Sequence, residues 1–186
     1  MLSVARDCIG KHLIHATERG TTVGRIVEAE AYRGPEDRAA HSYGGRRTAR
    51  TEVMFGPPGY AYVFLVYGLH WHFNLVTTAP GAPHAVLIRA VEPLEGLALM
   101  LERRGASRSG RELTNGPGKV CAAFGIDRSA YGADLTRAPL YLSEGSDGAA
   151  RPRVRRAPRI GVDYAGTWAA RPWRFYDAAS PFVSRR

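Results

Sequence analysis

Two glutamates lie two positions apart in a segment whose pattern predicts a β-strand. We expect this strand at Thr22 to Tyr32. Side chains on the same face of a strand repeat every two residues, so one face would carry Ile26, Glu28, Glu30 and Tyr32. Two carboxylates about 7 Å apart along a strand suit acid and base catalysis at a glycosidic centre, with hydrolysis as the reaction. The alternative is a solvated strand face on which neither glutamate has a chemical role.

Aromatic side chains form a second cluster. From residue 60 onward they alternate with aliphatic ones, so that one strand face would carry Tyr60, Tyr62 and Phe64. A row of rings on a positively charged protein can stack nucleobases, because every base offers a π-face. An ordinary aromatic ladder within the core is the alternative.

A hairpin tip is expected at Tyr67 and Gly68. Strands are predicted at Tyr60 to Val66 and at Leu69 to Thr77, which leaves these two residues as the turn. The flanking strands cannot bury a large ring at this position. Tyr67 would therefore project from the protein, as a wedge inserted into a base stack does.

The elements that must hold these residues combine strands with short helices. A third antiparallel strand is expected at Ala85 to Val91, a helix from Pro93 to a stop at Gly105, and a short helix ending at Phe124. Residues 4 to 16 fit helix and strand spacing equally. We therefore expect an α+β fold: a single compact domain over residues 1–186, with a curved, largely antiparallel sheet, a protruding β-hairpin and flanking helices.

Loops rich in glycine and arginine separate these elements. Gly34 to Arg50 is expected to be a loop, Ala106 to Thr114 a mobile loop, and Ser143 to Ala150 a loop that follows a brief strand at Leu140 to Leu142. The run from Gly116 to Lys119 opens the short helix, where free amide groups and a cation make a general anion site. An ordinary helix start explains that run equally well.

The composition favours a polyanionic partner. The chain has 26 Lys and Arg against 17 Asp and Glu, a formal charge of +9, and only Lys11 and Lys119 are lysines. Arginine pairs bidentately with phosphate, so nucleic acid is the first partner to expect. An arginine-biased genome would supply part of the same excess.

Cysteine usage and hydropathy indicate a reducing, aqueous compartment. Cys8 and Cys121 give neither a disulfide framework nor a Cys-x-x-Cys pair. The first fifteen residues lack the uninterrupted apolar core of a signal peptide. The most apolar run, Tyr60 to Leu75, is shorter than the roughly 20 residues that a membrane span needs. We expect a soluble cytoplasmic protein, associated with the nucleoid if it is bacterial.

Metal and covalent chemistry have little support in the sequence. His70 and His72 lie two apart without a third ligand in a known pattern, so no metal site is expected. The Gly-x-Ser-x-Gly motif is absent and neither cysteine has a nearby histidine, so a serine or cysteine nucleophile is not supported. No cofactor is expected.

Five ordered blocks carry a family resemblance over nearly the whole chain. They are IVEAEAYRGPEDRAAHSYGGRRT (26–48), MFGPPGYAYVFLVYGLHWHFN (54–74), VLIRAVEPLEG (86–96), NGPGKVCAAFGI (115–126) and RIGVDYAGTWAARPWRFY (159–176). In these blocks the chain resembles the 3-methyladenine (alkyladenine) DNA glycosylase family. The resemblance implies a DNA repair enzyme that flips an alkylated purine out of double-stranded DNA and hydrolyses its N-glycosidic bond, leaving an abasic site. The implied lesions are 3-methyladenine and 7-methylguanine, with hypoxanthine and ethenoadenine left open.

For catalysis, the resemblance assigns three positions. Glu30 corresponds to the general base that deprotonates a water, and Arg89 and the main-chain carbonyl of Ile160 correspond to groups that hold this water. Strand cleavage by a lyase route needs an amine nucleophile, and neither lysine lies in the motif around Glu30. The resemblance therefore implies a monofunctional glycosylase without lyase activity or cofactor.

For base recognition, the resemblance assigns five more positions. Tyr32, His41 and Phe64 fall where the family sandwiches the extruded base. Asn74 occupies the position that rejects normal guanine through its exocyclic amine, and Tyr67 the position that fills the gap in the duplex. The family often has tyrosine where this chain has Phe64, so stacking is kept but a hydroxyl hydrogen bond is lost, which bears on neutral lesions such as hypoxanthine.

Phosphate contacts are implied for the basic loops, through Arg46, Arg47, Arg50 and Lys119. Glu28 has no role in the resemblance, and we interpret it as a supporting residue. Duplex DNA that contains a damaged base is the expected partner, bound by a monomer with no obligatory protein partner and no membrane contact.

Two other functions share parts of this pattern. A carbohydrate glycosidase would use Glu28 and Glu30, but it has no need of a +9 charge or of an intercalating hairpin tip. A catalytically inactive module that binds damaged DNA would use the basic surface and Tyr67, yet it would release no base.

Overall fold

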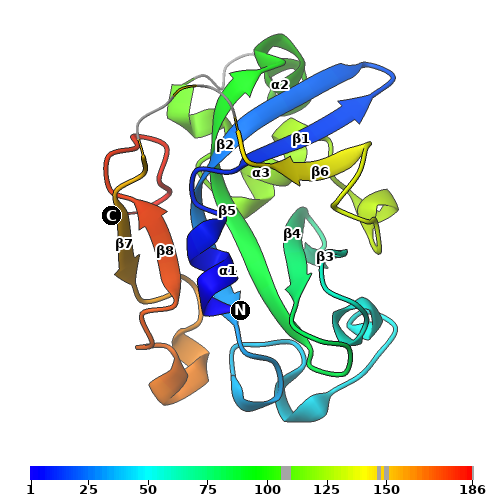
Figure 1. Cartoon of the computed structure of the whole chain (residues 1–186), viewed down its shortest axis with the longest axis vertical. Coiled ribbons are helices and arrows are strands. Elements are labelled where there is room, and N and C mark those ends of the chain that lie inside the picture. The colour runs from blue at the N-terminus through cyan, green and yellow to red at the C-terminus, as the bar shows by residue number, and fades with distance from the viewer. Residues whose placement is uncertain (106–109, 146–147, 149–150, 186) are drawn as a thin grey trace.

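One antiparallel sheet organises the chain in the computed structural model, which describes residues 1–105, 110–145, 148 and 151–185 (Figure 1). Within these residues the strand order is β3-β4-β5-β2-β1-β6, while β8 pairs with β2 and β7 pairs with β8. The strands are β1 (His12–Thr17), β2 (Gly20–Tyr32), β3 (Ala61–Val66), β4 (His70–Thr77), β5 (His84–Glu95), β6 (Leu140–Ser143), β7 (Val154–Ala157) and β8 (Arg174–Asp177).

Short helices flank the sheet. The α-helices of the described residues are α1 (Leu2–Asp7), α2 (Leu97–Arg104) and α3 (Pro117–Phe124). The 3-10 helices of the same residues are η1 (Gly34–Glu36), η2 (Tyr43–Gly45), η3 (Glu52–Phe55), η4 (Gly110–Leu113), η5 (Arg128–Ala130) and η6 (Asp163–Trp168). The predicted α+β class, with a curved antiparallel sheet and flanking helices, is confirmed.

The strand that carries the two glutamates, β2, is the centre of the sheet. It runs from Gly20 to Tyr32, two residues longer than predicted at its start. Along one edge it pairs with β5; along the other it pairs first with β1 and then, at Glu28 to Glu30, with β8. The glutamates therefore lie on a strand that has a neighbour on each side, which explains why neither is exposed.

The two faces of the sheet carry different side chains. Alternate residues of the central strands enter the main hydrophobic core together with all three α-helices, and this core includes Ala29, Phe73, Ile88, Met100 and Phe124. Residues between them in the sequence, such as Asn74 and Leu87, line a pocket on the other face. This alternation is the period of two that a strand imposes.

β-bulges interrupt the pairing of β2 with β5 beside the glutamates. Ile26 pairs with Val91 and Glu28 pairs with Ala90, so Val27 is an additional residue of β2. Ala29 then pairs with Ile88, so Arg89 is an additional residue of β5. An additional residue locally reverses the alternation of faces. The prediction that Ile26 shares a face with Glu28 and Glu30 is therefore wrong, because Ile26 packs in the main core.

The helix predicted to begin at Pro93 begins instead at Leu97. Pro93 lies within β5, opposite Gly24 and next to a register shift, where a residue without a backbone N–H is tolerated. Gly96, with a φ of 74°, turns the chain from β5 into α2. The predicted stop at Gly105 is confirmed, because Gly105 caps the helix with a φ of 86°.

The predicted hairpin is confirmed. β3 and β4 pair up to Val66 and His70, and the first two of the three residues between these have positive φ, 51° for Tyr67 and 70° for Gly68. Positive φ at both central residues is typical of the tight turns that connect hairpin strands. The Tyr67 side chain projects into solvent and is 92% exposed.

The remaining predictions concern shorter segments. The helix ending at Phe124 and the brief strand near residue 140 are confirmed, and residues 4 to 16 divide between α1 and β1. Part of each loop predicted at 106–114 and 143–150 lies outside the described residues. No helix in the described part of the chain is long and apolar enough to span a membrane.

We expect Gly96→Ala to destabilise the fold. A Cβ at residue 96 would lie 2.3 Å from the carbonyl oxygen of Thr21, and the positive φ adds strain. The expected loss in the free energy of unfolding, measured by urea denaturation, is about 2–4 kcal/mol. Gly44→Ala is the control: Gly44 has a left-handed φ of 68° and ψ of 15°, and among the described residues its Cβ would meet nothing within 4 Å, so only about 1 kcal/mol of backbone strain is expected. Equal losses would contradict a close-packing role for Gly96.

Candidate active site

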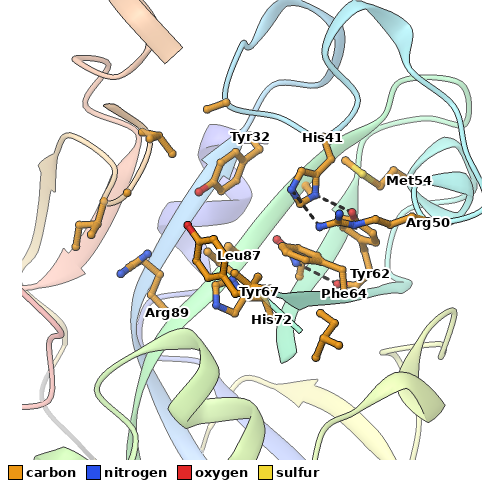
Figure 2. Close-up of a pocket in the computed structure, with 18 of the residues that line it drawn as sticks. Tyr32, His41, Arg50, Met54, Tyr62, Phe64, Tyr67, His72, Leu87 and Arg89 are labelled. Carbon is orange, nitrogen blue, oxygen red and sulfur yellow. Dashed lines mark hydrogen bonds between the residues drawn. The ribbon is translucent and has the colours of Figure 1, made fainter. Parts of the chain in front are cut away.

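A pocket of about 340 Å³ opens on the face of the sheet away from the main core (Figure 2). Its walls come from β2, β3, β4, β5, the loop around His41 and the segment 160–164. The lining is mostly aromatic and aliphatic, and it includes the guanidinium groups of Arg50 and Arg89. Apolar walls with a few polar groups are typical of small-molecule sites.

Glu30 lies directly behind the pocket wall and is fully buried. The backbone N–H of Ile160 donates to its Oε1 at 2.8 Å. The hydroxyl of Tyr32 donates to its Oε2 at 2.8 Å, and Nη1 of Arg89 lies 3.4 Å from the same oxygen. All three donor residues line the pocket, so the carboxylate is one residue layer from the cavity.

Burial raises the pKa of Glu30 above its ordinary value. The charge of Arg89, the amide of Ile160 and the hydroxyl of Tyr32 oppose this effect, whereas the neighbouring charge of Glu28 adds to it. A carboxylate in this environment is a stronger base than one in water.

Glu28 is also fully buried, but it faces different partners. Nη1 of Arg174 donates to its Oε1 at 2.8 Å, and the backbone N–H of Ser184 donates to its Oε2 at 2.7 Å. A solvated strand face is therefore excluded for both glutamates. Because both oxygens of Glu28 are engaged, a glycosidase site with two free carboxyl groups is not supported.

Aromatic rings form the walls of the pocket. In Figure 2 Tyr32 lies across the cavity from His41 and Phe64, whose ring centroids are 4.5 Å apart at 81°. Tyr62 packs 5.1 Å from Phe64, but it belongs to a small core cluster. Of the predicted row of rings, Tyr62 and Phe64 both line the pocket, and Phe64 packs against the core cluster to which Tyr62 belongs.

His41 is held as a neutral ring. Its Nδ1 lies 2.8 Å from the hydroxyl of Tyr62, and Nη2 of Arg50 lies 3.4 Å from its Nε2. Burial, followed by the charges of Arg50 and Arg46, lowers the pKa of His41 to about 4. At neutral pH this wall of the pocket therefore carries no charge on the imidazole.

Asn74 and Tyr67 both line the pocket, but Asn74 is buried and Tyr67 is exposed. Asn74 is buried, and its Nδ2 donates to the carbonyl oxygen of Tyr62 at 3.1 Å, which fixes the amide. Tyr67 lines the cavity from the hairpin tip. The structure thus brings seven of the predicted site side chains to one cavity, together with Ile160: Tyr32, His41, Arg50, Phe64, Tyr67, Asn74 and Arg89.

The four predicted phosphate contacts lie in different settings. Arg46, Arg47 and Arg50 are exposed, and Arg47 forms an ion pair with Glu52 at 2.6 Å. Arg50 reaches the pocket, where its guanidinium lies 4.8 Å from the Phe64 ring centre. The ammonium of Lys119 is bonded to Glu112 at 2.8 Å and to Asn115 at 2.7 Å.

Sequence reasoning missed a buried ion pair beside the pocket. The guanidinium of Arg159 donates through both terminal nitrogens to Asp37, and neither side chain is exposed. It also lies 4.8 Å from the ring centre of Tyr32. The pair joins residues 122 positions apart, so no local pattern signals it.

Tyr164 was also missed. It lines the pocket and is 72% exposed, and its hydroxyl donates to the carbonyl oxygen of Ala39 at 3.4 Å. Its position in the block 159–176 gave no signal for this, because an exposed tyrosine in a loop has no distinctive spacing.

Histidine clusters do not provide metal ligands in the described part of the chain, where no group of three or more His, Cys, Asp or Glu is arranged to hold an ion. Burial lowers the pKa of His72 to about 4, and the charge of Arg89 adds to this effect. His72 packs against Phe64 at a centroid distance of 5.5 Å, as part of the pocket wall.

Known proteins resemble this chain along its whole length. The family model of methylpurine-DNA glycosylase matches residues 1–181. A relative from Desulfitobacterium hafniense is 50% identical over 98% of this chain and 93% of its own length. A relative from Methanocella arvoryzae is 50% identical over 100% of this chain and 91% of its own length. A relative from Bacillus cytotoxicus is 45% identical over 99% of this chain and 94% of its own length. All three carry the name 3-methyladenine DNA glycosylase.

The match to the family model leaves only the last few residues of the chain uncovered. The three relatives match at least 98% of this chain at 45% identity or more, and the match covers more than 90% of each relative's own length. This chain belongs to the methylpurine-DNA glycosylase family and is a monofunctional DNA glycosylase of DNA repair.

Proposed function

We propose that this enzyme excises alkylated purines, 3-methyladenine and 7-methylguanine among them, with Glu30 as the general base. The observation that carries the proposal is the position of the Glu30 carboxylate, buried behind a pocket whose walls are aromatic and whose lining supplies all three donors to the carboxylate. In this proposal the everted base occupies the pocket, and the sugar lies over Glu30.

The attacking water binds to Glu30 in this proposal. An ionised carboxylate accepts about four hydrogen bonds, and three donors already reach Glu30, so it has capacity for one more. Arg89 and the main-chain carbonyl of Ile160 hold the water from the pocket side. Glu30 takes a proton from the water as it attacks the sugar C1′, and its negative charge stabilises the oxocarbenium-like transition state.

Charge and stacking select the lesion. A purine alkylated at N3 or N7 is cationic, so it is a better leaving group and is attracted to the faces of Tyr32 and Phe64. The neutral His41 adds a ring without opposing charge. We assign to Asn74 the rejection of guanine through the exocyclic amine of that base. Because Phe64 lacks a hydroxyl, we expect weak activity on neutral lesions such as hypoxanthine.

Tyr67 and the basic side chains act on the duplex. Alkylated purines pair poorly, which lowers the cost of eversion, and Tyr67 fills the gap that the base leaves. We assign phosphate contacts to Arg46, Arg47, Arg50 and Lys119, where the ion pairs of Arg47 and Lys119 exchange partners on binding. In this proposal the enzyme acts as a monomeric single domain in the cytoplasm, associated with the nucleoid if the source is bacterial, and needs no metal or organic cofactor.

Glu30→Gln tests the assignment of the base. The amide keeps the size and the acceptor oxygen of the carboxylate but cannot take a proton, so single-turnover excision of 7-methylguanine from a duplex should fall by at least about 100-fold. Affinity for duplex DNA with an abasic site should be unchanged. Glu18→Gln, at an exposed glutamate between β1 and β2, is the control and should match the wild type. Substantial turnover by Glu30→Gln would remove Glu30 from this role.

The pH dependence of excision should report Glu30. Because the pKa of Glu30 is raised, Glu30 becomes protonated at a higher pH than an ordinary glutamate does. The single-turnover rate should therefore fall as the pH drops through the pKa of Glu30. His41 charges only near pH 4, so His41→Asn should keep the same acid limb. An acid limb that disappears in His41→Asn would assign the titration to the imidazole instead.

Tyr67→Ala should impair eversion without changing the pocket. Stacking is worth about 1–3 kcal/mol per base, so the excision rate from duplex DNA should fall by about 10- to 100-fold. In single-stranded oligonucleotides no gap needs filling, and the variant should match the wild type. Tyr67→Phe keeps the ring and is the control. An equal loss on both substrates would show that Tyr67 does not act as a wedge.

A further inference from the structure

Four buried charged side chains form a row that leads away from the pocket. Nη1 of Arg89 lies 3.4 Å from Glu30, and Nε of Arg89 lies 3.5 Å from Glu28. Nη1 of Arg174 lies 2.8 Å from the same oxygen of Glu28. The side chains of the two glutamates are fully buried, and those of the two arginines are at most 10% exposed. Two positive charges thus balance two negative ones, as burial requires.

A segment distant in sequence holds the far end of this row. The backbone N–H of Ser184 donates to Oε2 of Glu28 at 2.7 Å. Nη1 of Arg174 also donates to the carbonyl oxygen of Arg185 at 2.7 Å. Residues 184–185 therefore bind both members of the pair that lies next to Arg89.

The same row also reaches a second group that donates to Glu30. Nε of Arg174 donates to the carbonyl oxygen of Pro158 at 3.0 Å, and the amide of Ile160, two residues later, donates to Glu30 at 2.8 Å. Two of the three groups that donate to Glu30, Arg89 and the amide of Ile160, are thus tied to the Glu28–Arg174 pair.

We propose that Glu28 is a positioning residue that draws the guanidinium of Arg89 away from Glu30, and that residues 184–185 keep Glu28 in place for this task. The proposal rests on the proposed role of Glu30 as the base. With Glu28 ionised, Arg89 is shared between two carboxylates, and its contact with Glu30 stays long. Without the charge of Glu28, Arg89 would pair with Glu30 alone, which would weaken the base and turn the guanidinium from the water that it holds.

Glu28→Gln removes the charge and keeps one acceptor oxygen, so either Arg174 or the backbone N–H of Ser184 loses its acceptor. The single-turnover rate should fall by up to about 100-fold, while affinity for abasic-site DNA stays within about twofold. The groups that face Glu30 are Arg89, Tyr32, Glu28 and the Ile160 amide. Because Glu28 raises the pKa of Glu30, the acid limb of the rate should move to lower pH in the variant. An unchanged rate and an unmoved acid limb, or a loss confined to thermal stability or DNA affinity, would overturn the proposal.

Ser184 offers a matched pair of variants that leave all charged side chains intact. Ser184→Pro removes the N–H that donates to Glu28 and should lower the rate in the same direction as Glu28→Gln. Ser184→Ala keeps this N–H, and the hydroxyl that it removes has no hydrogen-bond partner among the described residues, so it should match the wild type. Equal rates for the two variants would overturn the role of residues 184–185, whether or not Glu28→Gln folds.

Glu30→Gln measured in parallel separates this inference from the proposed function. If Glu30→Gln keeps substantial turnover, the assignment of the base fails. If Glu30→Gln is inactive while Glu28→Gln has the wild-type rate and acid limb, only the positioning role of Glu28 fails.

Discussion

The carboxyl group of Glu30 is buried in the middle of a β-sheet, and much of the surrounding structure supplies the donors and charges that it needs there. Removing a carboxylate from water is costly unless donors and cations replace the solvent. Glu30 receives them from three places: its own strand through Tyr32, the neighbouring strand through Arg89, and a distant segment through the amide of Ile160. These same residues line the pocket, so the groups that stabilise the carboxylate also form part of the pocket wall.

The arginine-rich composition has two uses. The sequence suggested an affinity for phosphate, and exposed arginines near the hairpin remain available for it. Three others, Arg89, Arg159 and Arg174, are buried and each contacts an acidic side chain. A planar guanidinium can donate to several acceptors at once and stays charged when buried, which lysine does less readily. Part of the basic excess therefore stabilises the site rather than binding DNA.

How much the sequence predicts depends on the range of the interaction. The strand at residues 22 to 32, the hairpin tip at Tyr67 and the short helix ending at Phe124 follow from local periodicity and turn residues, and they are confirmed. The face of Ile26 was wrong because a bulge depends on how β2 meets β5. The start of the helix after Pro93 was wrong because pairing with Gly24 kept the proline in a strand.

The residues of the site likewise divide into those that the sequence predicts and those that depend on distant contacts. Motif blocks placed Tyr32, His41 and Phe64 around one cavity, and the structure brings them together. The arginines that donate to Glu28 and Asp37, Arg174 and Arg159, lie more than a hundred positions away, and nothing in the local sequence signals such pairs. Burial was the decisive fact that the sequence lacked, because the same alternation describes a solvated and a buried strand face.

The most direct test of the account is a crystal structure of the enzyme with duplex DNA that carries a cationic pyrrolidine in place of the deoxyribose at one position. The pyrrolidine stands for the oxocarbenium-like sugar. It should be everted over Glu30, with one water bonded to the carboxylate, to Arg89 and to the carbonyl oxygen of Ile160, and with Tyr67 in the duplex gap. A pyrrolidine that stays within the helix, or that lies in the pocket with no water in contact with Glu30, would contradict the account.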